Sequence, residues 1–153
     1  MYIPRHFSIE EWVPEHIFTQ RGERAWELLD ERILRTADEM REVFGPMMIN
    51  TWFSPKLIEA YGFRQWSGLR TAGFFQTKHG DVEGDKKYCD SLSQHKFGRA
   101  FDCVFRDHTA ASVREAVRAM RPAQFPYLTA IETDISWFHG DCRNCEPLKE
   151  FAP

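Results

Sequence analysis

The stretch from Gly22 to Phe44 constrains the fold most, because its apolar residues recur at helical spacing over several turns. The apolar positions are Ala25, Leu28, Leu29, Ile33, Ala37, Met40 and Phe44. Charged residues such as Asp30 and Glu39 fill the other face, and Gly45-Pro46 ends the run as expected after a helix C-terminus. The pattern predicts one long amphipathic helix whose apolar stripe is buried against the rest of the chain.

Four further segments have the character of strands. Met47 to Trp52 and Ala100 to Phe105 are short apolar runs, which predict buried strands. Leu128 to Thr133 and Ser136 to Asp141 predict two more strands, or one strand broken by a turn at Asp134.

Shorter helices are predicted between these strands. One runs from Ser54-Pro55 to Tyr61, with proline at a first helical position, and another from Thr109 to Met120. Ser8 and Glu11 have the spacing of a capping box. Residues Gly62 to Leu92 show little periodicity and predict a long loop, which is unusual in a compact domain unless it has a function. The element order favours an α+β fold with a small, mostly antiparallel sheet and helices packed on one side.

Length and charge narrow the class of protein further. The chain has 153 residues, 42% hydrophobic and 28% charged, which suits one globular domain over 1–153. We expect an N-terminal helical lead-in over about residues 1–45 and a core over about 47–143. With a net charge of −3 and no long apolar run, we expect a monomer that binds neither nucleic acid nor membrane. Residues Met1 to Glu11 lack the features of a secretory signal, so we expect a cytoplasmic protein.

The densest chemical motif is the segment from Ser93 to Asp102, which contains His95. A further histidine, His139, follows near the chain end. Imidazole nitrogens and a carboxylate oxygen are ligands that zinc prefers, and a catalytic zinc uses three protein ligands with the fourth position open. The sequence therefore suggests a Zn²⁺ site made by His95, Asp102 and His139, with Gly98 allowing a sharp turn between the first two.

The pattern Ser93-x-His95-x-x-Gly98-x-Ala100-x-Asp102, followed by Trp137-x-His139, resembles the M15 family of zinc peptidases. That family includes D-alanyl-D-alanine carboxypeptidases and phage L-alanyl-D-glutamate endolysins, and it shares its fold with the hedgehog signalling domain. The resemblance covers roughly Met47 to Arg143. It implies a hedgehog-like fold, the three zinc ligands named above, peptidoglycan stem peptides as substrate, and a phage or prophage origin. A lysin of this kind acts on the cell wall after release from the cell that makes it.

The resemblance also implies a general base and an arginine that contacts substrate. The family base is an acidic residue shortly before the last histidine, often three positions earlier, but that position here is Ser136. Glu132 and Asp134 are the available carboxylates, and Glu132 is preferred. Ser67-Gly68-Leu69-Arg70 matches the setting of the arginine, so Arg70 is the candidate for holding substrate or stabilising negative charge.

Ser93 and Gln94 complete the candidate substrate-binding residues, Ser93 as a hydrogen-bonding group and Gln94 as a residue that orients the loop. Asp141 lies two positions after His139, on the same side of a strand, and is a candidate partner for a ligand imidazole or for Arg143.

Two other functions remain open from the sequence. Ser136 at the usual base position suits a catalytically inactive zinc module that binds cell wall or a phage structural partner. Cys142 and Cys145 form a single CxxC motif, which could serve thiol redox chemistry if one thiol had a low pKa. A second CxxC, the sign of a four-thiolate zinc site, is absent.

Overall fold

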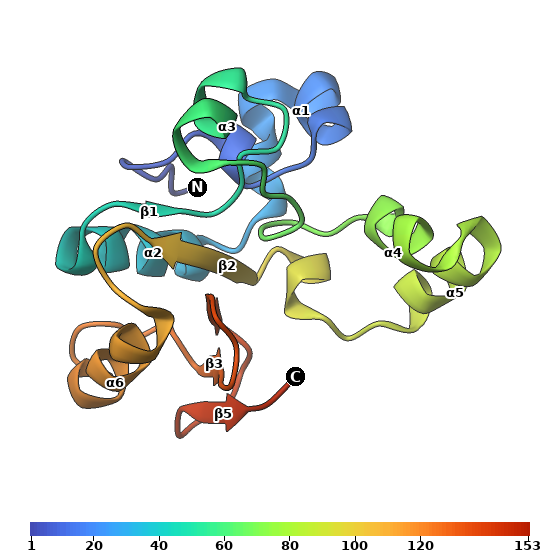
Figure 1. The fold of residues 1–153 in the computed structure, drawn as a ribbon. Coiled ribbons are helices and arrows are strands. Elements are labelled where there is room, and N and C mark those ends of the chain that lie inside the picture. Colours follow the sequence, from blue (N-terminus) through green and yellow to red (C-terminus); the bar gives the residue numbers. More distant parts are fainter.

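A computed structural model describes all of residues 1–153 and has an α+β architecture (Figure 1). The helices, with 3-10 helices labelled η, are η1 (Ile9–Glu11), α1 (Glu15–Arg21), η2 (Gly22–Leu28), α2 (Glu31–Phe44), α3 (Pro55–Tyr61), α4 (Ala72–His79), α5 (Asp81–Asp90), η3 (Gln94–Phe97) and α6 (Ala110–Met120). The strands are β1 (Met47–Met48), β2 (Ala100–Phe105), β3 (Ala130–Glu132), β4 (Phe138–Asp141) and β5 (Lys149–Phe151). None of the helices is both long and apolar enough to cross a membrane.

The five strands form one sheet in the order β1-β2-β4-β3-β5. Neighbouring strands are antiparallel except β3 and β5, which run parallel. These pairings confirm the predicted α+β class with a mostly antiparallel sheet. Strand β5 was not predicted from the sequence. Two of its three residues, Lys149 and Glu150, are charged and exposed, and the segment is too short to show alternation.

The two faces of the sheet differ because side chains alternate along each strand. One face contributes to the main hydrophobic core through Phe101, Cys103, Ile131 and Phe138. The same core contains residues of α2 and α6, so these helices cover that face: Ile33, Leu34, Ala37, Met40, Phe44, Val113 and Val117. The residues that alternate with the core positions, Asp102, Glu132 and His139, therefore belong to the opposite face.

The prediction of a single helix over Gly22–Phe44 is wrong in its first part, where the chain forms η2 and then an extended residue, Leu29. Asp30 caps α2, and its Oδ1 accepts the backbone N–H of Arg32 at 3.0 Å. The Asp30 N–H donates to the carbonyl oxygen of Gly98 at 2.9 Å. A continuous helix would direct this N–H to its own previous turn. The hydrogen bond from Asp30 to Gly98, in the loop before β2, therefore takes the place of a hydrogen bond within the helix.

The predicted long loop over Gly62–Leu92 is also wrong, because α4 and α5 lie within it. Figure 1 shows these helices side by side, projecting away from the sheet. Their closest approach is at Gly84, where an added Cβ would lie 2.5 Å from the Cα of Gln76. Each helix has a single buried residue (Phe75 and Gly84, respectively), so neither carries the apolar stripe that sequence periodicity detects.

The other predicted elements are confirmed with shifted ends. The capping box is present, since Glu11 Oε1 accepts the Ser8 N–H at 3.2 Å, and Thr109 caps α6. The turn between β3 and β4 contains Asp134 at a positive φ of 58°. The first strand stops at Met48, well before the predicted end at Trp52. After it, the chain bonds to the segment that precedes the site, for example through Asn50 Oδ1, which accepts the Ser67 N–H at 2.8 Å.

Candidate metal centre

The register of the sheet places two of the three predicted ligands side by side. Asp102 of β2 and His139 of β4 are direct partners in an antiparallel pair. Residues opposite each other in such a pair lie on the same face with Cβ atoms about 5 Å apart. Both side chains are buried, and His139 Nδ1 lies 2.7 Å from Asp102 Oδ1.

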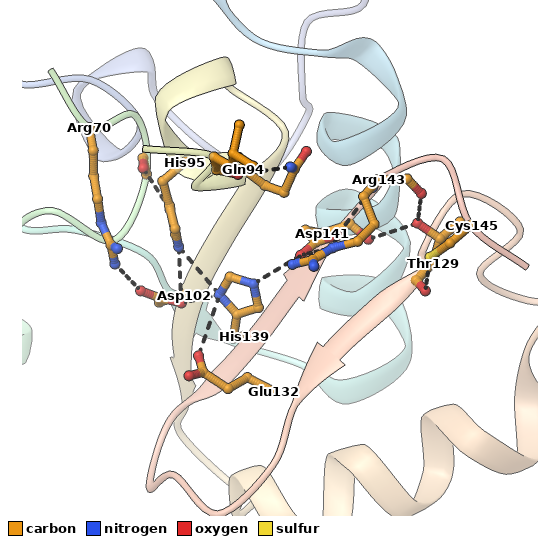
Figure 2. Close-up of polar contacts among 12 residues, drawn as sticks. Arg70, Gln94, His95, Asp102, Thr129, Glu132, His139, Asp141, Arg143 and Cys145 are labelled. Carbon is orange, nitrogen blue, oxygen red and sulfur yellow. Dashed lines mark hydrogen bonds and ion pairs between the residues drawn. The ribbon is translucent and has the colours of Figure 1, made fainter. Parts of the chain in front are cut away.

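The third ligand comes from outside the sheet. His95 lies in η3, which ends at Gly98 in the left-handed conformation with φ of 64°, as the sharp turn predicted there requires. An added Cβ at Gly98 would lie 2.2 Å from the Leu28 carbonyl oxygen, so this position has no room for a side chain. The turn carries the chain from η3 directly into β2 and brings His95 over Asp102 (Figure 2).

The tautomer of His95 is set by its backbone partner. Its Nδ1 lies 2.8 Å from the carbonyl oxygen of Gly68, which can only accept, so Nδ1 carries the proton. The other ring nitrogen, Nε2, is then free to act as a ligand. Nε2 lies 3.3 Å from His139 Nδ1 and 3.3 Å from Asp102 Oδ1.

These spacings fit a tetrahedral zinc ion. Bonds of about 2.0–2.1 Å at tetrahedral angles place ligand atoms about 3.3 Å apart. Two of the three separations equal that value and the third is 2.7 Å. His95, Asp102 and His139 also form the one group of potential metal ligands in the chain whose donor atoms converge, all within 4.8 Å of one another. The 2.7 Å separation is a hydrogen bond between His139 and Asp102, which a bound zinc would replace. Two imidazoles and one carboxylate are a donor set that zinc accepts with its fourth position open.

The three groups of the triad shift one another's pKa values. Burial alone would raise the pKa of Asp102, but the imidazoles of His95 and His139 outweigh it and hold this pKa well below its usual range. Burial alone would lower the pKa of His139, yet its hydrogen bonds to Asp102 and Asp141 raise this pKa to about 9. Burial lowers the pKa of His95, which keeps that ring neutral. A proton on His139 thus supplies positive charge where a metal ion would replace it.

A second set of contacts holds the ligands in place. His139 Nε2 lies 3.3 Å from Asp141 Oδ2, and Asp141 in turn accepts from Arg143 Nε at 2.8 Å, so both partners considered for Asp141 are present. Arg70 Nη2 donates to Asp102 Oδ2 at 2.9 Å. Such partners orient metal ligands and strengthen their binding.

Arg70 therefore has a structural role, the positioning of Asp102, in addition to the predicted role in substrate binding. Its Nε donates to the Trp66 carbonyl oxygen at 2.8 Å and its Nη2 is engaged by Asp102. Its Nη1 has no hydrogen-bond partner within the chain, and the side chain lines the cleft above the triad. One edge of the guanidinium thus orients the metal ligand Asp102, while Nη1 remains available to a molecule bound in the cleft.

The structure separates the two candidate bases. Continuing the β3–β4 register past Ile131 and Gly140 puts Glu132 opposite His139, and Glu132 Oε2 lies 3.9 Å from His139 Nδ1. Asp134 is exposed in the turn that follows, and its Oδ2 accepts from the Thr133 hydroxyl at 3.1 Å. Glu132 is therefore the carboxylate beside the triad, and Asp134 is not part of the site.

A cleft of about 290 Å³ opens above these residues. Ser93 and Gln94 line it, as their assignment to substrate binding requires. Gln94 Nε2 donates to the Leu92 carbonyl oxygen at 3.2 Å, which fits its predicted role in orienting the loop, and its buried Oε1 has no partner. The Ser93 hydroxyl makes no hydrogen bond within the chain.

Several residues of the site have no signal in the sequence. The carbonyl oxygen of Gly68 is a backbone group, so its contact with His95 depends on the path of the chain. Trp137 and Phe151 line the cleft, and the ring of Phe151 lies edge-on to His139 at 5.7 Å between centroids. Of these, only Trp137 has a signal in the sequence, because it belongs to the Trp137-x-His139 motif.

The CxxC motif lacks the properties of a redox site. Cys142 is buried, and burial raises the pKa of its thiol to about 12. Cys145 donates to the Thr129 carbonyl oxygen at 3.3 Å, and both cysteines are free thiols. A reactive thiol needs a lowered pKa, so this geometry argues against thiol redox chemistry.

We expect Gly68→Ala to weaken zinc binding by about 10–100-fold, the range for loss of a ligand's orienting partner. An added Cβ would lie 2.3 Å from the carbonyl oxygen of Trp12, a core residue, so the segment must shift and move its own carbonyl away from His95. Competition with a chromophoric chelator measures the affinity. Gly73→Ala, where a Cβ meets nothing nearer than 3.6 Å, is the matched control. Unchanged affinity in Gly68→Ala would show that this carbonyl does not orient His95.

Comparison with protein families, curated proteins and solved structures finds no match to this chain. Its function is therefore inferred from the motif and from the geometry of the site.

Proposed function

We propose that the protein is a zinc metallopeptidase that hydrolyses peptide bonds in peptidoglycan stem peptides. The observation that carries this proposal is the convergence of His95, Asp102 and His139 at zinc-ligand spacing, with a free carboxylate beside them at one cleft. The resemblance of the motif to M15 peptidases supports the same assignment. A hedgehog-like fold and a phage or prophage origin belong to the proposal, as does action on the cell wall after release.

The chemistry divides between the metal and Glu132. When bound, zinc supplies a Lewis acid that polarises the scissile carbonyl and activates water. Glu132 accepts a proton as the water oxygen bonds to the carbonyl carbon. The same carboxyl group then delivers that proton to the amine as the carbon–nitrogen bond breaks. Its place beside His139 puts it within reach of both events.

Other groups of the cleft suit binding of a short peptide. Arg70 Nη1 can donate to a substrate carbonyl or carboxylate, or to the negative charge that develops on the carbonyl oxygen. Stem peptides are short and carry free carboxylates, which complement a cleft lined by Arg70 and Arg143.

The test is hydrolysis of purified peptidoglycan fragments by the full chain before and after metal removal. We expect cleavage that chelation abolishes and added zinc restores, because the three ligands act only through the ion. Mass spectrometry of the products identifies the bond cut and distinguishes carboxypeptidase from endopeptidase action. Cleavage that persists after complete chelation, or zinc-loaded protein that cuts no fragment, would refute the proposal.

The alternative is an inactive zinc module that binds cell wall or a phage structural partner. Ser136 favours this alternative, because it occupies the position at which many M15 peptidases have their general base. Glu132 offers a carboxylate from the neighbouring strand instead, which supports the enzyme.

A further inference from the structure

A second hollow, which we call the aromatic pocket, lies outside the metal site. It has a volume of about 360 Å³. Four rings line it, those of Trp52, Phe53, Phe63 and Trp66. Three polar side chains share the lining: Glu15, His16 and Gln65. The Phe63 ring is 66% exposed, a large apolar area to leave in water.

The backbone is held in an unusual state at the two tryptophans. Trp52 has φ of 37° and Trp66 has φ of 65°, so two of the three non-glycine residues with positive φ lie in this pocket. Bulky residues rarely adopt this conformation, and where it persists at a site it points to function. The two indoles meet edge to face at 5.1 Å between centroids.

Hydrogen bonds between the two loops keep this conformation. The backbone N–H groups of Thr51 and Trp52 both donate to the Arg64 carbonyl oxygen, at 2.9 and 3.0 Å. The Arg64 N–H donates back to the Thr51 hydroxyl at 2.7 Å. The aromatic pocket is therefore built by a fixed pair of loops.

Shared lining residues link the aromatic pocket to the metal cleft. A connecting hollow shares Gln65 and Trp66 with the aromatic pocket, and it shares Arg70, Asp102 and Trp137 with the metal cleft. The Trp66 carbonyl oxygen also accepts from Arg70 Nε at 2.8 Å. A ligand that extends from the metal past Trp137 and Arg70 would thus approach the ring of Trp66.

We propose that the aromatic pocket is a saccharide-binding subsite that holds a hexopyranose ring of the glycan strand while the attached peptide reaches the metal. This inference rests on the proposed function. A sugar ring presents C–H groups on its faces and hydroxyls at its edge. The aromatic rings match the faces, and the carboxylate, imidazole and amide of Glu15, His16 and Gln65 match the hydroxyls.

An apolar peptide side chain fits this lining less well. It would remove three polar groups from water without offering them hydrogen bonds, which is unfavourable. A hydroxyl-rich ligand can satisfy such groups, whereas a hydrocarbon side chain cannot.

The test measures binding of a β-1,4-linked N-acetylglucosamine tetramer, which carries no peptide, to the full-length zinc-loaded protein by calorimetry and tryptophan fluorescence. We expect saturable binding that Trp66→Ala and Phe63→Ala each weaken about tenfold, as loss of one ring contact requires. Phe63→Ala keeps the test valid if Trp66→Ala unfolds, because Phe63 is largely exposed. Tyr127→Ala, an exposed ring (40%) outside the aromatic pocket, is the control and should bind like wild type.

The outcomes separate the two proposals. A wild-type protein that cleaves glycan-free stem peptides but does not bind the tetramer would overturn the subsite and leave the peptidase intact. Tetramer binding that both pocket variants retain in full would likewise overturn the subsite. Tetramer binding weakened by the pocket variants in a protein that cuts no peptide would support the subsite and refute the peptidase.

Discussion

His95→Ala is expected to lose its zinc, with an affinity reduced by more than about a hundredfold, beyond the range for loss of an orienting partner. Its Nε2 lies 3.3 Å from each of the other two donor atoms, so its removal leaves only Asp102 and His139. Two protein ligands fall short of the three that catalytic zinc sites use. Elemental analysis should find about one zinc per wild-type chain and far less in the variant. Hydrolysis of peptidoglycan fragments should disappear with the metal.

His79→Ala is the matched control, since His79 is exposed at the end of α4 and lies outside the cleft. It should keep both zinc and activity. His95 also forms a hydrogen bond to the Gly68 carbonyl oxygen, so its removal could disturb the fold. Circular dichroism of His95→Ala shows whether the variant is folded and has lost only a metal ligand. A folded His95→Ala protein that retains a full complement of zinc would refute the triad as the metal site.

Glu132→Gln is expected to lower the rate of hydrolysis by about 10²–10⁴-fold, the usual contribution of a general base. The substitution keeps the shape of the side chain but removes its ability to accept a proton at neutral pH. Zinc content should stay near that of wild type, because Glu132 lies beside the ligand set and is not part of it. The rate with stem peptides at saturating zinc, together with elemental analysis, measures both effects.

Asp134→Asn is the control for this variant. Asp134 follows two residues later in the chain but is exposed in the turn, so its substitution should leave the rate unchanged. A large loss of rate in Asp134→Asn with none in Glu132→Gln would reverse the assignment of the base. A wild-type protein that binds zinc and wall fragments without turnover would instead favour the inactive module.

Local sequence was sufficient to predict the elements whose limits are set by neighbouring residues. β2 covers the predicted Ala100–Phe105, and α6 follows its predicted cap at Thr109. The break between η2 and α2 was not predictable in this way, because Asp30 donates to Gly98, 68 positions further along the chain. Helices α4 and α5 were not predicted, because each buries only one residue and so shows no apolar periodicity.

The candidate metal site was likewise predictable in part from the sequence. The sequence determined which side chains can bind a metal, since His95, Asp102 and His139 have that chemistry wherever they lie. Only the tertiary structure decided that Glu132, and not Asp134, stands beside them. In a strand the side chains alternate, so the register of β3 on β4 sends Glu132 toward His139 and leaves Asp134 in the turn beyond the strand end. The turn that joins the two strands, with Asp134 at a positive φ, sets this register together with the packing of Ile131 and Phe138 in the core, and the sequence pattern alone gives neither.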